Sequence, residues 1–243
     1  MLKFLSWDCA NRTLAHAHVT VNSRIIADCL VWTEKLINWR RMNEKVTPLN
    51  MESLQFLLTE YALITNSFIT FHSVDVKDVL DGKKVSDTDE IERAKALHDY
   101  LVNSNISLDR LDAVGPLNAA GVSTRVLIEQ QPTKVNSATN NKSTHVSSQL
   151  AFYYITKNPA LVNPKLKNKL TVCAGMEYAV YMGSVESDYY ARKKHTKMSL
   201  MYLLKAFNRE HIVDGIPRSC LDDLADAVFQ VFAHMISQKL FIK

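Results

Sequence analysis

Apolar and polar positions alternate along the first part of the chain with the period of a β-strand. Alanine and valine at positions 15, 17, 19 and 21 alternate with polar residues, which is typical of a strand with one buried face. Short apolar runs at 2–7 and 25–32 flank this segment, and the three together predict an antiparallel meander. In that meander, His16 and His18 fall on the exposed face.

Two later runs also predict strands, and longer segments predict helices. The run 125–132 is apolar in its middle and ends at a proline, and 170–174 is a second short apolar run. Apolar residues recur at intervals of three and four where a helix buries one face. This pattern predicts helices at about 51–64, 89–101, 145–156, 189–208 and 221–238.

The order of these elements predicts a fold class. Three strands, a helix, a strand, a helix, a strand and two helices is the order of an α/β RNase H-like fold, with a mixed five-stranded sheet flanked by helices. We expect residues 1–243 to form a single domain, with 66–121 as a mainly helical insertion. In such a fold the first and fourth strands are neighbours, and the last helix crosses them.

Acidic residues lie at the ends of these particular elements. Asp8 follows the first strand, Glu129 ends the fourth, and Asp222, Asp223 and Asp226 begin the last helix. An aspartate after a strand often forms a turn, and acids at a helix N-terminus complement its dipole. In the predicted fold, however, all of them converge. Neighbouring carboxylates repel one another and favour a bound divalent cation, so we expect a metal site here.

Composition narrows the class of protein. The chain is 47% hydrophobic and 22% charged, as globular proteins are. Its four cysteines are widely spaced, which predicts reduced thiols in an intracellular protein rather than a zinc site or disulfides. No apolar run approaches the roughly 20 residues of a membrane span, so we expect no membrane association.

Basic residues are clustered although the net charge is only +4. The clusters lie at 192–197, at 165–169 and at Arg40–Arg41. Clustered positive charge favours a surface that binds a polyanion. The alternative is that these basic residues only form a solvated surface.

Several of these stretches together resemble one family, the RuvC-like Holliday junction resolvases of poxviruses and other nucleocytoplasmic large DNA viruses. Residues 8–15 (DCANRTLA) are similar to that family's D-x-G-x-K-N-x-A, and 128–132 (IEQQP) resembles I-E-x-Q-P. Residues 141–143, 190–196 and 221–226 (LDDLAD) are similar to its polar loop, its basic helix start and its terminal L-D-D-x-A-D. The motifs occur in the family's order. The chain departs from it at Ala10 and at Arg12–Thr13.

The resemblance implies a nuclease and its metal ligands. It implies a metal-dependent, structure-selective endonuclease that resolves four-way (Holliday) and branched DNA junctions by paired symmetric cuts during viral DNA replication and recombination. Asp8, Glu129, Asp223 and Asp226 would then hold two Mg²⁺ ions, for which Mn²⁺ substitutes. Asp222 is the alternative to Asp223, because both lie within about one turn of Asp226.

The resemblance also implies roles for basic residues. One of Lys193, Lys194 and Lys197 would stabilise charge on the cleaved phosphate, and Lys194 is named as the catalytic candidate. The expected DNA contacts are Lys134, Lys142, Arg192, Lys193, Lys194 and Lys197. The insertion is expected to extend this surface through Lys83–Lys84 and 93–95.

Paired cuts in a four-way junction imply a two-fold homodimer. For the helix 145–156, packing within the protomer is the default interpretation, and a contribution to the dimer interface is the alternative hypothesis. The expected location is the host cytoplasm or a virus factory.

Two other functions remain open. One is an RNase H-fold nuclease with another substrate, such as an RNA–DNA hybrid, or an exonuclease, and the other is a DNA-binding module without catalysis.

Overall fold

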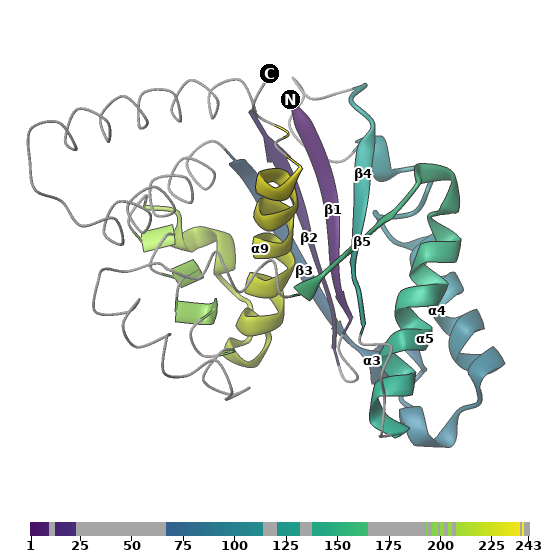
Figure 1. The fold of residues 1–243 in the computed structure, drawn as a ribbon. Helices are drawn as coiled ribbons and strands as arrows, with labels where there is room; N and C mark the ends of the chain where they lie inside the picture. The colour runs from purple at the N-terminus through teal and green to yellow at the C-terminus, as the bar shows by residue number, and fades with distance from the viewer. Residues whose placement is uncertain are drawn as a thin grey trace, which may run out of the picture.

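One mixed sheet organises the part of the chain that the structure describes. The structure is a computed structural model that describes residues 1–9, 13–22, 67–113, 121–131, 138–164, 193, 196–198, 200–201, 204–205, 208–238 and 240. Within these residues, five strands lie in the order β3-β2-β1-β4-β5 (Figure 1). They are β1 (Leu2–Cys9), β2 (Thr13–Val21), β3 (Ser67–Asp75), β4 (Thr124–Glu129) and β5 (Ala160–Val162). The first three pair antiparallel, whereas β4 is parallel to both β1 and β5.

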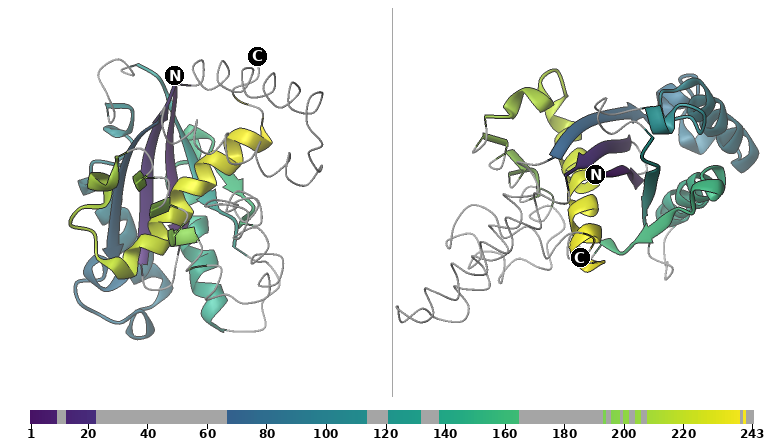
Figure 2. Two further views of the ribbon diagram at one scale, coloured as in Figure 1. Left: turned by 90° about the vertical axis from the view of Figure 1, so that its left-hand side faces the viewer. Right: turned by 90° about the horizontal axis from the view of Figure 1, so that it is seen from above.

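Helices cover both faces of the sheet. The α-helices described are α3 (Val76–Val79), α4 (Glu90–Asn103), α5 (Ala138–Tyr153) and α9 (Leu221–Ser237). The 3-10 turns described are Val85–Asp87, Leu111–Ala113, Ile155–Lys157, Glu210–Val213 and Arg218–Cys220. Figure 2 shows α9 against one face of the sheet, while α4 and α5 lie on the other side. This arrangement confirms the predicted α/β class and the mixed five-stranded sheet with flanking helices. No helix within the described residues has the length and apolar character needed to cross a membrane.

Two hydrophobic clusters, one on each face, follow from the alternation of side chains along the strands. On the α9 face, Phe4 of β1 packs with Val228, Phe229 and Phe232 of α9. On the other face, Trp7 packs in a cluster that includes side chains of α4 and α5, among them Leu97, Leu101, Leu150 and Tyr154. Almost every residue of β1 is therefore buried, as expected for a central strand covered on both faces.

The third strand of the sheet differs from the sequence prediction. The predicted strand 25–32 lies outside the described residues, and β3 pairs with β2 over its whole length, from Thr13 opposite Asp75 to Val21 opposite Ser67. The region 66–121 thus contributes a strand to the central sheet and is not only a helical insertion. The sequence obscured β3 because Ser67 is buried and Phe68 is exposed, which reverses the usual pattern.

Two other element boundaries also differ. The strand that pairs with β4 is β5, Ala160–Val162, and not the predicted 170–174. The predicted strand 170–174 and the predicted helix 51–64 both lie outside the described residues. A strand of three residues is too short to show a period. Helix α5 begins at Ala138, seven residues before the predicted start. The prediction missed its first turns because they consist mainly of polar residues of low helix propensity. In contrast, α4, β4 and α9 lie where they were predicted.

The prediction that His16 lies on an exposed face is wrong. Only 4% of His16 is exposed, and its ring lies 4.7 Å from that of Trp7 and 5.2 Å from that of His72 between centroids. Both faces of the sheet are covered, so β2 has no solvated side at this point. Burial, followed by the charges of His18 and His72, lowers the pKa of His16 well below its ordinary value. Burial and then the charge of Lys3 lower the pKa of His18 to about 4.

We therefore expect His16 to make the fold sensitive to acid. The folded protein holds the ring neutral, whereas the unfolded chain binds a proton near pH 6.5, so this contribution is complete above that pH and is lost as pH falls toward the folded pKa. Between pH 8 and pH 5, His16 accounts for a loss of about 2 kcal/mol in the free energy of unfolding. Urea denaturation at pH 8 and at pH 5 measures the free energy of unfolding. The loss between these two pH values should be about 2 kcal/mol smaller in His16→Leu than in the unsubstituted protein.

A matched variant separates this effect from general acid sensitivity. His211 is exposed in the 3-10 turn Glu210–Val213, so His211→Leu should show the same loss between pH 8 and pH 5 as the unsubstituted protein. An equal loss in His16→Leu and in the unsubstituted protein would show that His16 does not titrate on unfolding.

Candidate active site

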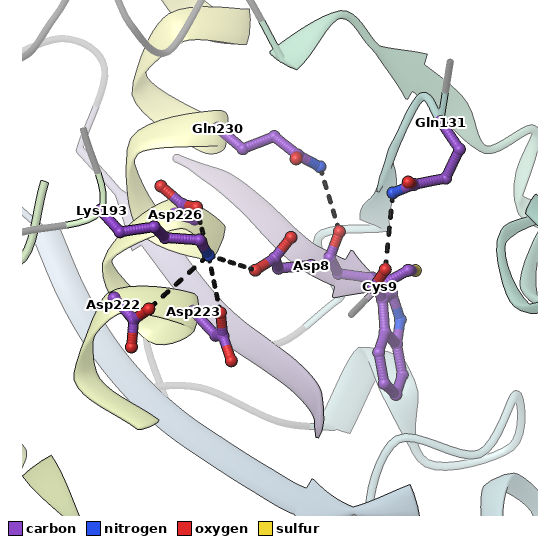
Figure 3. A network of polar contacts seen from close by, with 9 residues as sticks. Asp8, Cys9, Gln131, Lys193, Asp222, Asp223, Asp226 and Gln230 are labelled. Atoms are coloured by element: carbon purple, nitrogen blue, oxygen red, sulfur yellow. Dashed lines mark hydrogen bonds and ion pairs between the residues drawn. The ribbon is translucent and has the colours of Figure 1, made fainter. Parts of the chain in front are cut away.

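Three aspartates from β1 and α9 come together on one face of the sheet. The alternation along β1 directs Trp7 into the α4 and α5 cluster and Asp8 toward α9. Asp223 and Asp226, three residues apart, lie on the side of α9 that faces Asp8 (Figure 3). All three side chains are buried. The predicted convergence of the first strand with the last helix is therefore present for these three residues.

The ammonium group of Lys193 lies among these carboxylates. Its Nζ donates hydrogen bonds to Oδ1 of Asp223 at 2.7 Å and to Oδ2 of Asp226 at 3.0 Å. The same Nζ is 3.8 Å from Oδ2 of Asp8 and 3.8 Å from Oδ2 of Asp222. Figure 3 shows the four carboxylates surrounding this single nitrogen. A cation thus lies at the centre of the acidic cluster, and it belongs to the protein.

Carboxylates outnumber the ammonium among the described residues of this cluster, because oxygens of four aspartates lie within 4 Å of the single Nζ of Lys193. Burial opposes the charge on Lys193, but the carboxylates of Asp8, Asp226 and Asp223 outweigh it and raise the pKa of the ammonium above its ordinary value. Burial and the charge of Asp8 raise the pKa of Asp223 to about 6, even though Lys193 acts in the opposite direction. The pocket therefore favours additional positive charge.

Glu129 ends β4 beside this cluster. Strands β1 and β4 are parallel with Trp7 opposite Ile128, so the next positions along the two strands are Asp8 and Glu129. Leu127 belongs to the cluster on the α9 face and Ile128 to the opposite one, so the alternation places Glu129 on the α9 side. Its backbone carbonyl accepts a hydrogen bond of 3.4 Å from Ser147 Oγ of α5. Glu129 is thus at the strand end that the sequence predicted.

Two glutamines that the sequence analysis did not select hold the backbone around Asp8. Gln230 of α9 donates from Nε2 to the carbonyl of Trp7 at 3.5 Å, and Gln131 donates from Nε2 to the carbonyl of Cys9 at 3.5 Å (Figure 3). The signal for Gln230 was its position, a buried amide four residues after Asp226 on an otherwise apolar part of the helix. These contacts connect the strand end to α9 and to the segment after β4.

The basic residues predicted to contact DNA are only partly described. Lys134, Arg192 and Lys194 lie outside the described residues, and Lys142 belongs to α5 with its side chain outside them. Lys197 donates from Nζ to the carbonyl of Arg218 at 2.9 Å, and the other predicted contact, Lys193, lies in the acidic cluster. In the insertion, Lys83 pairs with Glu92, and Arg93 donates to the carbonyl of Thr88. Both of these side chains already have partners within the fold.

The donor atoms of the cluster suit a hard divalent cation. Carboxylate oxygens from β1 and α9 are the ligand type that Mg²⁺ and Mn²⁺ prefer, and no softer cysteine or histidine ligand is required. Among the described residues, no three His, Cys, Asp or Glu side chains are grouped as they would be around a metal ion. The four aspartates are instead arranged around the Lys193 ammonium.

No protein-family model matches the chain, and comparisons with curated proteins and with solved structures likewise find no match. The features that bear on function are therefore the sequence motifs and the cluster of Asp8, Asp223, Asp226 and Lys193.

Proposed function

We propose that the protein is a Mg²⁺-dependent endonuclease with an RNase H-like fold that resolves four-way and branched DNA junctions during viral DNA replication and recombination. The observation that carries the proposal is the burial of Asp8, Asp223 and Asp226 around one cation, at the point where a central strand meets the last helix. Carboxylates gathered in a buried site repel one another, and this repulsion favours a bound divalent cation.

The aspartates, together with Glu129, are the residues that would hold the metal. Asp223 is proposed ahead of Asp222, because it lies closer to the central cation and is buried, whereas 28% of the Asp222 side chain is exposed. Bound divalent ions would supply an activated water and charge relief at the leaving oxygen. Gln230 and Gln131 would keep the Asp8 carboxylate in position by fixing the carbonyl groups of the residues before and after it, Trp7 and Cys9. Lys193 would bring a positive charge to the same place.

Branched DNA is proposed as the substrate on the strength of the sequence motifs. The stretches 8–15, 128–132 and 221–226 resemble the resolvase motifs, and each of them contributes an acid at or beside the cluster. Lys193 belongs to the basic stretch 192–197 and also contacts the aspartates of the acidic cluster. Phosphates that approach the carboxylates would therefore meet positive charge.

Two copies of the protein are proposed to act together, since two symmetric cuts need two active sites. The groove between α4 and α5 is lined by Leu97, Leu101 and Phe152, and 80% of Phe152 is exposed. The same surface therefore carries an exposed phenylalanine ring and a groove that could receive the ring of another copy. A two-fold contact between identical copies requires such a self-complementary surface. We propose that the two protomers meet here.

This contact predicts that Phe152→Ser converts the dimer to a monomer. Light scattering after gel filtration should show half the mass of the unsubstituted protein at micromolar concentration. Phe68→Ser is the matched control, because Phe68 is a phenylalanine with 51% exposure on β3, and it should leave the mass unchanged. A monomeric unsubstituted protein, or a dimeric Phe152→Ser variant, would contradict the proposed interface.

Cleavage of matched substrates tests the proposed activity. The purified protein is given a four-way junction, a linear duplex of the same sequence and an RNA–DNA hybrid, each with Mg²⁺ and each with EDTA. The proposal expects paired nicks at the junction that require the metal. Preference for the hybrid would favour an RNase H-type activity instead. Binding to the junction without any cleavage would favour a DNA-binding module, and either result would overturn the proposal.

A further inference from the structure

Lys193 holds the position that a metal ion would need. Its Nζ is hydrogen-bonded to Asp223 and Asp226 and lies within 4 Å of oxygens of Asp8 and Asp222 as well. Only 18% of the side chain is exposed, so the ammonium is largely enclosed by the protein. The residue therefore interacts directly with the proposed metal ligands.

The ammonium lies where a divalent ion that bridged the same two oxygens of Asp223 and Asp226 would lie. The N···O distances of 2.7 and 3.0 Å are those of charge-assisted hydrogen bonds. An Mg²⁺ ion would lie about 2.0 to 2.1 Å from its oxygen ligands, inside the space that Nζ now fills. Two cations so close together would also repel each other strongly. Entry of the metal therefore requires Lys193 to leave Asp223 and Asp226.

The metal-free cluster nevertheless needs a cation. Without Lys193, the site would lose the cation that lies within 4 Å of oxygens of all four aspartates, and the repulsion among these carboxylates would grow. The ammonium offsets part of this repulsion and so keeps the first turns of α9 against the end of β1.

We propose that Lys193 is the built-in counter-cation of this site. It keeps the acidic cluster assembled before the metal binds, and the incoming ion displaces it from Asp223 and Asp226. The inference rests on the proposed metal-dependent function and adds a regulation of metal entry. It has two consequences of opposite sign. Removing the Lys193 charge lowers the stability of the metal-free protein, and it strengthens the binding of the metal.

The test is a titration of the full chain with Mn²⁺ alone, without DNA, followed by calorimetry and by the electron paramagnetic resonance signal of free Mn²⁺. Lys193→Met is expected to bind Mn²⁺ at least tenfold more tightly than the unsubstituted protein, because a competing charge at close range is gone. Lys193→Arg keeps the positive charge and should remain within a few-fold of the unsubstituted protein. In EDTA, Lys193→Met should melt at a lower temperature.

Lys157→Met is the matched control. Lys157 ends the 3-10 turn Ile155–Lys157 and forms an ion pair of 2.8 Å with Asp112 of the turn Leu111–Ala113, and 20% of its side chain is exposed, close to the value for Lys193. Its removal takes away the same charge and a similar ion pair, but it should leave Mn²⁺ affinity unchanged. This control separates a local competition from the general effect of one fewer positive charge.

The outcomes distinguish this inference from the proposed function. Tighter binding in Lys193→Met alone supports the displacement. Equal or weaker binding in a folded Lys193→Met overturns the displacement while leaving a metal site in place. An absence of Mn²⁺ binding in the unsubstituted protein and in every variant overturns the proposed function itself, and the displacement with it.

Discussion

Replacing Asp226 by asparagine is expected to reduce junction cleavage by about 10³-fold or more, while the protein stays folded. The substitution keeps the size of the side chain but removes a buried charge that lies 3.0 Å from the central cation. A metal supplies several kcal/mol of charge stabilisation in the transition state, and a loss of about 4 kcal/mol corresponds to about 10³-fold in rate. Single-turnover cleavage of a four-way junction in Mg²⁺ measures this effect.

The same variant should be no less stable than the unsubstituted protein in EDTA. Four carboxylates surround one ammonium, so removing one of them relieves repulsion among the others. Asp99→Asn is the matched control, because it makes the same chemical change on the exposed surface of α4 and should leave cleavage unchanged. An Asp226→Asn variant that cleaves normally, or one that unfolds in EDTA, would show that Asp226 is a structural ion-pair partner instead.

Replacing Phe229 by alanine is expected to destabilise the fold by about 3 to 5 kcal/mol, the usual cost of removing a buried aromatic ring. Phe229 is fully buried between α9 and the sheet, and its ring meets that of Phe232 edge to face at 6.2 Å between centroids. The helix that carries Asp223 and Asp226 is held by these contacts, so the loss acts on the element that positions the site. Urea denaturation at neutral pH measures the change.

Phe68→Ala supplies the comparison for this prediction. Phe68 is half-exposed on β3, so its truncation should change the free energy of unfolding by about 0.5 kcal/mol or less. Similar losses in Phe229→Ala and Phe68→Ala would mean that the packing of α9 on the sheet contributes little to stability.

The sequence predicted best the elements whose pattern is long and undisturbed. Helix α9 lies where its apolar period placed it, and β4 lies where its apolar run placed it. The sheet edges were harder to predict. Strand β3 has an exposed phenylalanine and a buried serine, and β5 has only three residues, so neither shows a clear period. His16 was misplaced because burial of its face depends on α4 and α5, which are distant in the sequence.

The acidic residues of the site were predictable because strand order and side-chain alternation determine where they lie. The direction of the Asp8 side chain follows from the alternation along β1, and those of Asp223 and Asp226 follow from their spacing along α9.

The lysine was harder to assign. The sequence favoured Lys194 as the catalytic residue and Lys193 as a phosphate contact, and Lys194 lies outside the described residues. Adjacent helical positions differ by about 100° in direction, so only the structure reveals that Lys193 faces the acids.

A crystal structure of the protein grown with Mn²⁺, with the metal located by its anomalous scattering, tests the central claim most directly. We predict a manganese peak bounded by carboxylate oxygens of Asp8, Glu129 and Asp226, on the α9 side of the sheet. A structure with no manganese between β1 and α9, or one in which Glu129 points away from Asp8 and binds no shared ion, would contradict it.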